Sequence, residues 1–319
     1  MVSVRRPLWR GRWIAAWLLA AGLALLPACG MSKDDPVASG EMGEVKSGPA
    51  AAPEAQSLLA EAERAAGSLN RYAFSLYLTQ RISDAAAGAA QDAAGSATGP
   101  APADPASEWT ESVTDSEGRV ETDPLKIDQT LRTSFAGETS EYRTILVPDG
   151  YYVYDTVFRQ WGKLPADEAE QVAATFSDFQ VDLPGAIRQV AALGPAVASR
   201  DANGIVIRYE GGGEPARTFV VRLLESTLGW ATLDEALRES LEVQHLLVEL
   251  TLDPQRRWPV ACRLESRMAL AAGDGERTIL EQTLTAAYRK HNATAAIELP
   301  KEAKEAPELG PPLEEPESP

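Results

Sequence analysis

The sequence predicts an α+β fold in which a curved antiparallel β-sheet, a half-barrel, has helices packed across its concave face. Strand-like runs follow one another through short turn signals, which is typical of antiparallel sheets. Apolar and polar residues alternate along several of these runs, so one face of the sheet should be covered and the other wet. Helical patterns occur only at the start and in the middle of the folded part, where they can supply the covering layer.

The folded part is expected to begin with a helix over residues 55–70. Leu58, Ala62, Ala66 and Leu69 recur there at helical spacing, with charged residues between them. A half-buried strand follows, because apolar residues then recur at every second position: Tyr72, Phe74, Leu76 and Leu78. Of these, Leu76 is expected to face the interior.

Residues 84–107 interrupt the strand pattern. They are mostly Ala, Gly, Asp and Pro and contain no aromatic or large aliphatic side chain. Such a stretch cannot bury enough apolar surface to offset the entropy of ordering it. We therefore predict a disordered loop inserted between two strands of a single domain, and no domain boundary.

Strands are predicted again after the insert. Leu125, Ile127, Leu131 and Phe135 share one parity, which places Leu131 on the inner face. Asp149–Gly150 lies between two strand-like runs and is the strongest short-range hairpin signal in the chain. Residues 161–164 follow as a short edge strand.

The middle of the chain is predicted to be mainly helical. One helix should begin at Pro165 and a second should cover residues 185–193. A hairpin over residues 197–209 follows. Between residues 215 and 241 helix is favoured over strand, with a break near Gly229.

Alternation returns in the last third, which predicts strands over residues 246–252, 260–270 and 278–288. A last short strand is expected at residues 295–299. Pro and Glu then dominate, so residues 301–319 are predicted to be a disordered acidic tail.

The N-terminus predicts a lipid anchor. Four arginines precede an uncharged apolar run that ends in Leu26–Cys29, with the small residue Ala28 before the cysteine. This layout is that of a lipoprotein signal peptide over residues 1–28, too short to span a bilayer. The motif resembles that of bacterial lipoproteins, which implies that a diacylglyceryl group, with acyl chains such as palmitate, is attached to Cys29; residues 29–54 would form a flexible tether. An ordinary signal peptide with an incidental cysteine is the alternative.

Charge and cysteine content limit the possible partners. All four Arg of the signal segment would be lost with it, which leaves 26 basic against 47 acidic residues. Such a balance argues against nucleic acid and against docking on anionic lipid. If Cys29 carries a lipid, Cys262 has no cysteine to pair with, and its parity predicts a buried, inert thiol.

Several short stretches resemble a known group of proteins: Leu69–Phe74, Gly150–Asp155, Gln160–Pro165 and Ile297–Pro300. Together with the Leu26–Cys29 motif, they resemble lipoproteins without assigned function from Gram-positive bacteria, whose fold is similar to lipoprotein carriers of the LolA and LprG type. The resemblance implies one LolA-like domain over residues 55–300, which the insert enlarges. It supplies no catalytic residues to carry over.

No set of residues predicts catalysis, a metal site or a cofactor. The two histidines, His245 and His291, lie in no metal-binding spacing, and no nucleophile elbow or phosphate loop occurs. We therefore expect a protein that is not an enzyme and that holds no metal or cofactor.

Aromatic residues gather around the predicted hairpin: Tyr151, Tyr152, Tyr154, Phe158 and Trp161. They could pack the core and a cross-strand ladder, or line an apolar cavity between sheet and helices. On the second interpretation the ligand-binding residues are Leu76, Leu131, Tyr152, Tyr154 and Trp161.

The leading hypothesis from the sequence is an extracytoplasmic lipoprotein, held on the cell membrane by its lipid, that binds a lipid or another hydrophobic or acylated ligand. The alternative is an envelope scaffold or regulator that binds another protein and has a solidly packed core. An apolar cavity would favour the first hypothesis and a filled core the second.

Overall fold

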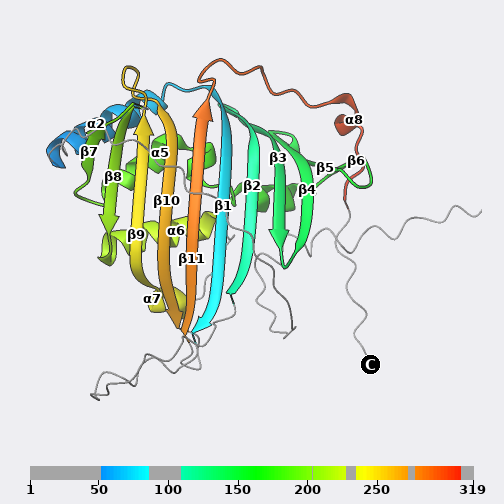
Figure 1. Ribbon diagram of the computed structural model, residues 1–319. Coiled ribbons are helices and arrows are strands. Elements are labelled where there is room, and N and C mark those ends of the chain that lie inside the picture. Colours follow the sequence, from blue (N-terminus) through cyan, green and yellow to red (C-terminus); the bar gives the residue numbers. More distant parts are fainter. Residues whose placement is uncertain (1–51, 86–108, 203, 228–234, 272–276, 310–319) are drawn as a thin grey trace, which may run out of the picture.

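The computed structural model describes residues 52–85, 109–202, 204–227, 235–271 and 277–309. In this part the backbone forms one antiparallel sheet of 11 strands in the order β6-β5-β4-β3-β2-β1-β11-β10-β9-β8-β7. The sheet is open, because β6 and β7 end this order on opposite sides and do not pair with each other (Figure 1). The predicted α+β class with a curved antiparallel sheet is confirmed.

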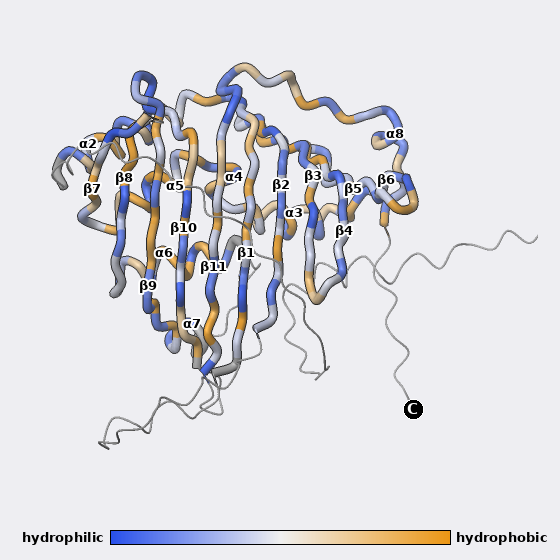
Figure 2. The backbone as a smooth tube through the Cα atoms, in the orientation of Figure 1, coloured by the Kyte–Doolittle hydropathy of each residue, from blue (hydrophilic) through white to orange (hydrophobic). Residues whose placement is uncertain are grey.

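The strands are β1 (Arg71–Ala85), β2 (Trp109–Thr122), β3 (Leu125–Phe135), β4 (Glu138–Val147), β5 (Gly150–Asp155), β6 (Gln160–Lys163), β7 (Val197–Arg200), β8 (Ile205–Gly211), β9 (Glu242–Leu252), β10 (Pro259–Ala271) and β11 (Arg277–Arg289). The helices are α2 (Ala52–Ala66), α3 (Ala166–Ala173), α4 (Asp178–Val181), α5 (Leu183–Ala192), α6 (Gly213–Thr227), α7 (Glu235–Ser240) and α8 (Lys301–Lys304). Helices α3, α5 and α6 lie on one face of the sheet, which we call the inner face (Figures 1 and 2).

Period-two alternation decides which side chains reach the inner face. Along β1 the even-numbered residues from Tyr72 to Leu78 are buried, while Tyr77 remains 46% exposed on the opposite face. The same alternation of hydrophobic and hydrophilic positions is visible along the strands in Figure 2. The predicted inward direction of Leu76 and Leu131 is confirmed, since both are buried in register with this face.

Short polar contacts fasten the short helix α4 to the inner face. Tyr72 Oη donates to the carbonyl of Gln180 at 2.8 Å, and Tyr288 Oη donates to the carbonyl of Phe179 at 2.6 Å. Gln180 Nε2 donates to Gln129 Oε1 at 2.6 Å. Burial raises the pKa of both phenols, so they remain protonated donors at neutral pH.

The space between the inner face and the helices is filled by side chains. One continuous cluster of buried apolar residues extends from Ala55 in α2 through all the central strands to Tyr288 in β11. Such packing leaves little free volume. The two cavities that are described below both lie outside this space.

The C-terminal segment (residues 290–309) differs most from the prediction. It leaves β11, crosses the face opposite the helices, which we call the outer face, and reaches β6 (Figure 1). The predicted strand at residues 295–299 is wrong, because the backbone there bonds to side chains and not to a neighbouring strand. The predicted onset of disorder at residue 301 is also wrong, since residues 301–304 form α8 and Ala303 is fully buried.

Most predicted elements are found near their expected positions. The hairpins predicted around residues 149–150 and 201–204 are confirmed, although the first one turns at residues 148–149, one residue earlier than predicted. Helix over residues 215–227 is also confirmed. The predicted break near Gly229, most of the insert (residues 86–107), the signal peptide and nearly all of the tether lie outside the described residues. Strand β1 continues to Ala85, two residues into the predicted insert.

Candidate functional site

The five residues expected to line one ligand cavity lie on two faces of the sheet. Leu76 and Leu131 are 7% and 8% exposed on the inner face. Tyr152 and Tyr154 lie on the outer face, because they alternate with Tyr151 and Val153, which fill the inner core. Trp161 lies on the outer face too, because it stands opposite Tyr154 in the sheet register. The prediction that all five residues line a single cavity is therefore wrong.

Tyr152 belongs to a second, smaller core on the outer face. It packs with Ile145 from β4 and with Ile297 and Ala303 from the C-terminal segment. Trp161 is partly buried against the same cluster. The segment thus turns part of a face that the sequence predicted to be wet into a buried interface.

Beside this small core lies a groove of about 740 Å³ between strands β4–β6 and the C-terminal segment, which we call the C-terminal groove. Three of its residues stand directly opposite one another in the sheet register: Arg143 pairs with Tyr154, and Tyr154 pairs with Trp161. The two aromatic rings are 5.2 Å apart between centroids. Its lining consists of Arg143, Tyr154, Arg159, Gln160, Trp161, Pro300, Glu302, Glu305, Ala306 and Pro307.

The guanidinium of Arg143 is held in place from two sides. Its Nε and Nη2 donate to the two carboxylate oxygens of Asp128 at 3.0 and 3.1 Å, and its charge lies 5.7 Å from the centre of the Trp161 ring. Arg119 also donates to Asp128, at 2.7 Å. Burial alone would raise the pKa of Asp128, but the hydrogen bonds and charges of the two arginines hold it below its ordinary value.

The other wall of the C-terminal groove presents acidic side chains. Glu302 and Glu305 are exposed and three residues apart in and just after α8, so they share one side of it. This wall is attached to the sheet edge, because the amide of Lys163 donates to the carbonyl of Pro307 at 3.0 Å and the amide of Leu309 donates to the carbonyl of Lys163 at 2.8 Å. Gly162 leaves space for Leu309, since a Cβ there would approach Leu309 to 2.6 Å.

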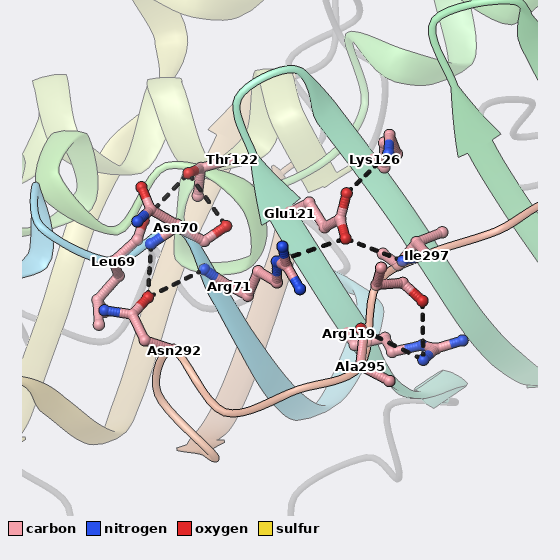
Figure 3. Close-up of polar contacts among 11 residues, drawn as sticks. Leu69, Asn70, Arg71, Arg119, Glu121, Thr122, Lys126, Asn292, Ala295 and Ile297 are labelled. Carbon is pink, nitrogen blue, oxygen red and sulfur yellow. Dashed lines mark hydrogen bonds and ion pairs between the residues drawn. The ribbon is translucent and has the colours of Figure 1, made fainter.

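Glu121 fixes the middle of the C-terminal segment (Figure 3). Its buried carboxylate accepts from the amide of Ile297 at 2.9 Å and pairs with Lys126 at 2.8 Å and with Arg71 at 3.6 Å. Burial would raise the pKa of Glu121, but these hydrogen bonds and charges lower it below the ordinary value. At its start the segment is fastened by Asn292, whose Oδ1 accepts from the amide of Asn70 at 2.7 Å.

The second cavity is a shallow, largely open depression of about 550 Å³ at the end of α2, beside the turn between β9 and β10. Its lining is rich in arginine and includes one indole: Glu61, Arg64, Ala65, Ser68, Arg256, Arg257 and Trp258.

Sequence reasoning missed Arg143, Arg159, Glu302 and Glu305. The predicted turn at residues 149–150 could not have placed Arg143 opposite Tyr154, because a two-residue turn there would pair Arg143 with Thr156, whereas the structure pairs Val147 with Gly150 and therefore turns one residue earlier. Nothing in the sequence pattern indicated the two glutamates, since their stretch has the composition of a disordered tail.

Cys262 is buried, as predicted, and burial raises the pKa of its thiol to about 12, far from the range of a reactive thiolate. Within the described ranges, no group of three or more His, Cys, Asp or Glu side chains is placed to hold a metal ion. None of the described helices combines the length and the apolar character needed to cross a bilayer.

Two solved structures are similar to this chain at low identity. LprF from Mycobacterium bovis is 10% identical, with a TM-score of 0.41 over 78% of this chain and 98% of its own. A beta-barrel-like protein of the domain of unknown function DUF1849 from Brucella abortus is also 10% identical, with a TM-score of 0.19 over 69% of this chain and 99% of its own.

The comparison with curated proteins gave no match. A family model matches residues 54–308, which include all of the described elements from α2 to α8 except the first two residues of α2. The chain therefore belongs to DUF6612, a family of unknown function.

Proposed function

We propose that this chain is an extracytoplasmic lipoprotein that binds an amphipathic ligand, a lipid or an acylated molecule, in the C-terminal groove and does not act as an enzyme. The observation that carries this proposal is the groove itself. Its volume of about 740 Å³ lies in the range of roughly 300–1,000 Å³ that is usual for small-molecule sites. Two adjacent aromatic rings offer an apolar surface, and charged side chains surround it.

The proposed site differs in position from the one that the sequence favoured. A ligand between sheet and helices would have to displace a continuous packed core, which costs the free energy of opening it. In the C-terminal groove an apolar chain can lie against Tyr154 and Trp161 without such opening. A polar headgroup can then meet Arg143, Arg159 and the two glutamates at the rim.

Membrane attachment belongs to the same proposal. Its support is the Leu26–Cys29 motif after an uncharged apolar run. Residues 1–28 would be removed, a diacylglyceryl group on Cys29 would hold the protein at the cell membrane, and residues 29–54 would tether the domain. Changing Cys29→Ser should abolish metabolic labelling by palmitate and release the protein from the detergent phase; full labelling of the variant would refute the assignment.

Binding can be tested on the chain from Gly30 to Pro319, since its described part has a hydrophobic core of its own. An environment-sensitive fatty-acid probe should bind with saturation. The double substitution Tyr154→Ala/Trp161→Ala should weaken binding at least tenfold, because it removes the apolar surface. Tyr77→Ala is the matched control, since Tyr77 on β1 is an exposed aromatic residue that lies, like Tyr154 and Trp161, on the outer face of the sheet.

Three outcomes of this titration are informative. Saturable binding that is lost only in the double variant supports the proposal. If the double variant still binds the probe, but a Leu131→Asp variant that circular dichroism shows to be folded does not, the ligand binds between the inner face and the helices. Absence of saturable binding in the unaltered chain would contradict ligand binding altogether.

A second candidate function is favoured by the filled core between sheet and helices. The protein would then be an envelope scaffold or regulator, and the C-terminal groove would receive an extended peptide from a protein partner. Failure of amphiphile binding, together with absence of copurified lipid, would favour this alternative.

A further inference from the structure

The second cavity unites two parts of the chain that are far apart in sequence. Arg64 lies in the last turn of α2 and Ser68 just after it. The turn between β9 and β10 contributes Arg256, Arg257 and Trp258. Three arginines and one glutamate, Glu61, therefore share one cavity. Such a local excess of positive charge is unexpected in a chain with 30 basic and 47 acidic residues.

Two of these arginines lack an ion pair in the part of the chain that the structure describes. Glu61 is engaged by Arg257, at 3.1 Å, which leaves no second carboxylate in the cavity lining. Arg64 donates from Nε to the carbonyl of Ala60, its own helix neighbour, at 3.2 Å. Arg256 lies over the Trp258 ring, with its guanidinium carbon 4.7 Å from the ring centre.

The only acid in the turn itself, Asp253, is occupied by backbone donors. Its Oδ1 accepts from the amides of Gln255 and Arg256 at 2.9 and 2.6 Å. The backbone amide of Asp253 donates to the carbonyl of Trp258 at 2.8 Å, and the carbonyl of Asp253 accepts from the amide of Arg257 at 3.0 Å. These two hydrogen bonds close the turn. Those backbone donors, with the charge of Arg256, hold the pKa of Asp253 below its ordinary value, so the carboxylate stays ionised and keeps the turn closed.

The turn is therefore preorganised around the cationic side chains. Arg257 adopts a left-handed backbone conformation, with φ of 63°, which is uncommon for a residue other than glycine. The Trp258 ring contacts Arg256 and also His291, whose ring centre is 5.2 Å from its own. The indole thus fixes the direction of Arg256 at little further cost in side-chain entropy.

From this geometry we infer that the cavity between α2 and the β9–β10 turn binds a phosphate group, with Arg64 and Arg256 as its ligands. Arginine suits this role because its planar fork of donors matches phosphate oxygens in a bidentate manner. Arg257 is held by Glu61 and serves as a positioning residue. The Ser68 hydroxyl lies in the same lining but donates its hydrogen to the carbonyl of Ala65 at 2.6 Å, so the two arginines are the proposed donors to the phosphate.

The inference concerns a site separate from the C-terminal groove, and either can fail without the other. The same phosphate chemistry could come from a lipid headgroup or from a soluble phosphate ester. Two arms of one experiment separate these sources: calorimetric titration with inorganic phosphate, and cosedimentation with vesicles of phosphatidylglycerol or of phosphatidylcholine. Ionic strength is kept constant with chloride, since screening would otherwise change both results.

The test compares the chain from Gly30 to Pro319 with two variants of equal net charge. Arg64→Gln/Arg256→Gln removes the proposed ligands. Arg188→Gln/Arg263→Gln removes two exposed arginines that belong to other ion pairs, with Glu63 and with Glu265. Because both variants lose two positive charges, a nonspecific effect of charge would affect them equally.

We expect phosphate to bind saturably and at least tenfold more weakly to Arg64→Gln/Arg256→Gln, with the control variant unchanged. Parallel loss of binding to phosphatidylglycerol vesicles would identify a lipid headgroup as the source, and no vesicle binding by any variant would identify a soluble ester. Absence of phosphate binding to the unaltered chain, or equal weakening in the control variant, would overturn the inference.

Discussion

At the scale of single residues, the outer face is held together by buried carboxylates that bind several donors at once. The carboxylate of Glu121 accepts a hydrogen bond from the amide of Ile297 and forms ion pairs with two cationic side chains. The carboxylate of Asp128 accepts hydrogen bonds from two arginines. A carboxylate with a lowered pKa in the folded state stabilises the fold above its unfolded pKa, and the contribution is lost as the pH falls through the folded value. Acid should therefore loosen the C-terminal segment.

Glu121→Gln tests this statement. The variant should lose about 1–3 kcal/mol of unfolding free energy at neutral pH, because a charged, buried hydrogen-bond acceptor is replaced by a neutral one. Its stability should also depend less on pH below about 4.3, the ordinary pKa of a glutamate. Thermal melts between neutral and acidic pH measure both effects. Identical pH dependence in the two proteins would show that Glu121 has no such role.

Cys262 illustrates a residue whose environment the sequence predicted well. Its parity on β10 indicated burial, and its thiol lies in the main core at 2% exposure. Cys262→Ser should destabilise the fold by roughly 1–3 kcal/mol, since a hydroxyl is buried there without a partner. Urea denaturation gives this difference, and rapid labelling of the native thiol by a maleimide would contradict its burial.

The predicted ligand site was wrong because residues that are close in sequence lie on opposite faces of the sheet. Tyr151 and Tyr152 are neighbours in sequence, yet one fills the inner core and the other packs under the C-terminal segment. A cluster of aromatic residues in sequence therefore becomes two clusters in space, because successive side chains of a strand point to opposite faces. Only the register, and not composition, separates them.

At the scale of elements, hairpins with strong turn signals were predictable and two other kinds of element were not. Strand β2 gave no clear signal, because its inner-face residues include Ser112, Thr114 and Ser116, so neither face is consistently apolar. The C-terminal segment was missed because few apolar residues anchor it, and its Pro and Glu content resembles that of a disordered tail.

Ile297→Ala tests the anchoring of the C-terminal segment. Ile297 is 3% exposed, so truncating it should remove about 2–4 kcal/mol of packing free energy. The lost packing free energy should weaken the attachment of the C-terminal segment more than it destabilises the whole fold, because the inner core does not include Ile297. Limited proteolysis should then cleave residues 290–309 faster while the melting temperature falls only slightly. A large fall in melting temperature with no change in cleavage would contradict this local role.

At the scale of the whole molecule, the sequence predicted the open sheet, its covering helices and most of its turns. These follow from periodicity, which is local information. The functional surfaces could not be predicted in this way. Both cavities form between segments that are distant in sequence, α2 with the β9–β10 turn and β4–β6 with the C-terminal segment. Such contacts depend on tertiary packing that periodicity does not contain.

The same division of the molecule gives a test of where an amphipathic ligand binds. Hydrogen exchange of backbone amides reports local opening across the whole chain. Saturation with the fatty-acid probe should slow exchange in β5, β6 and residues 290–309, because a ligand in the C-terminal groove bridges the sheet and the segment that covers it. Exchange in α5 and β9 should stay unchanged, since both pack within the inner core. Protection that appears instead in α3–α6 and in the inner strands would mean that the helices open to admit the ligand, and would place the site between sheet and helices.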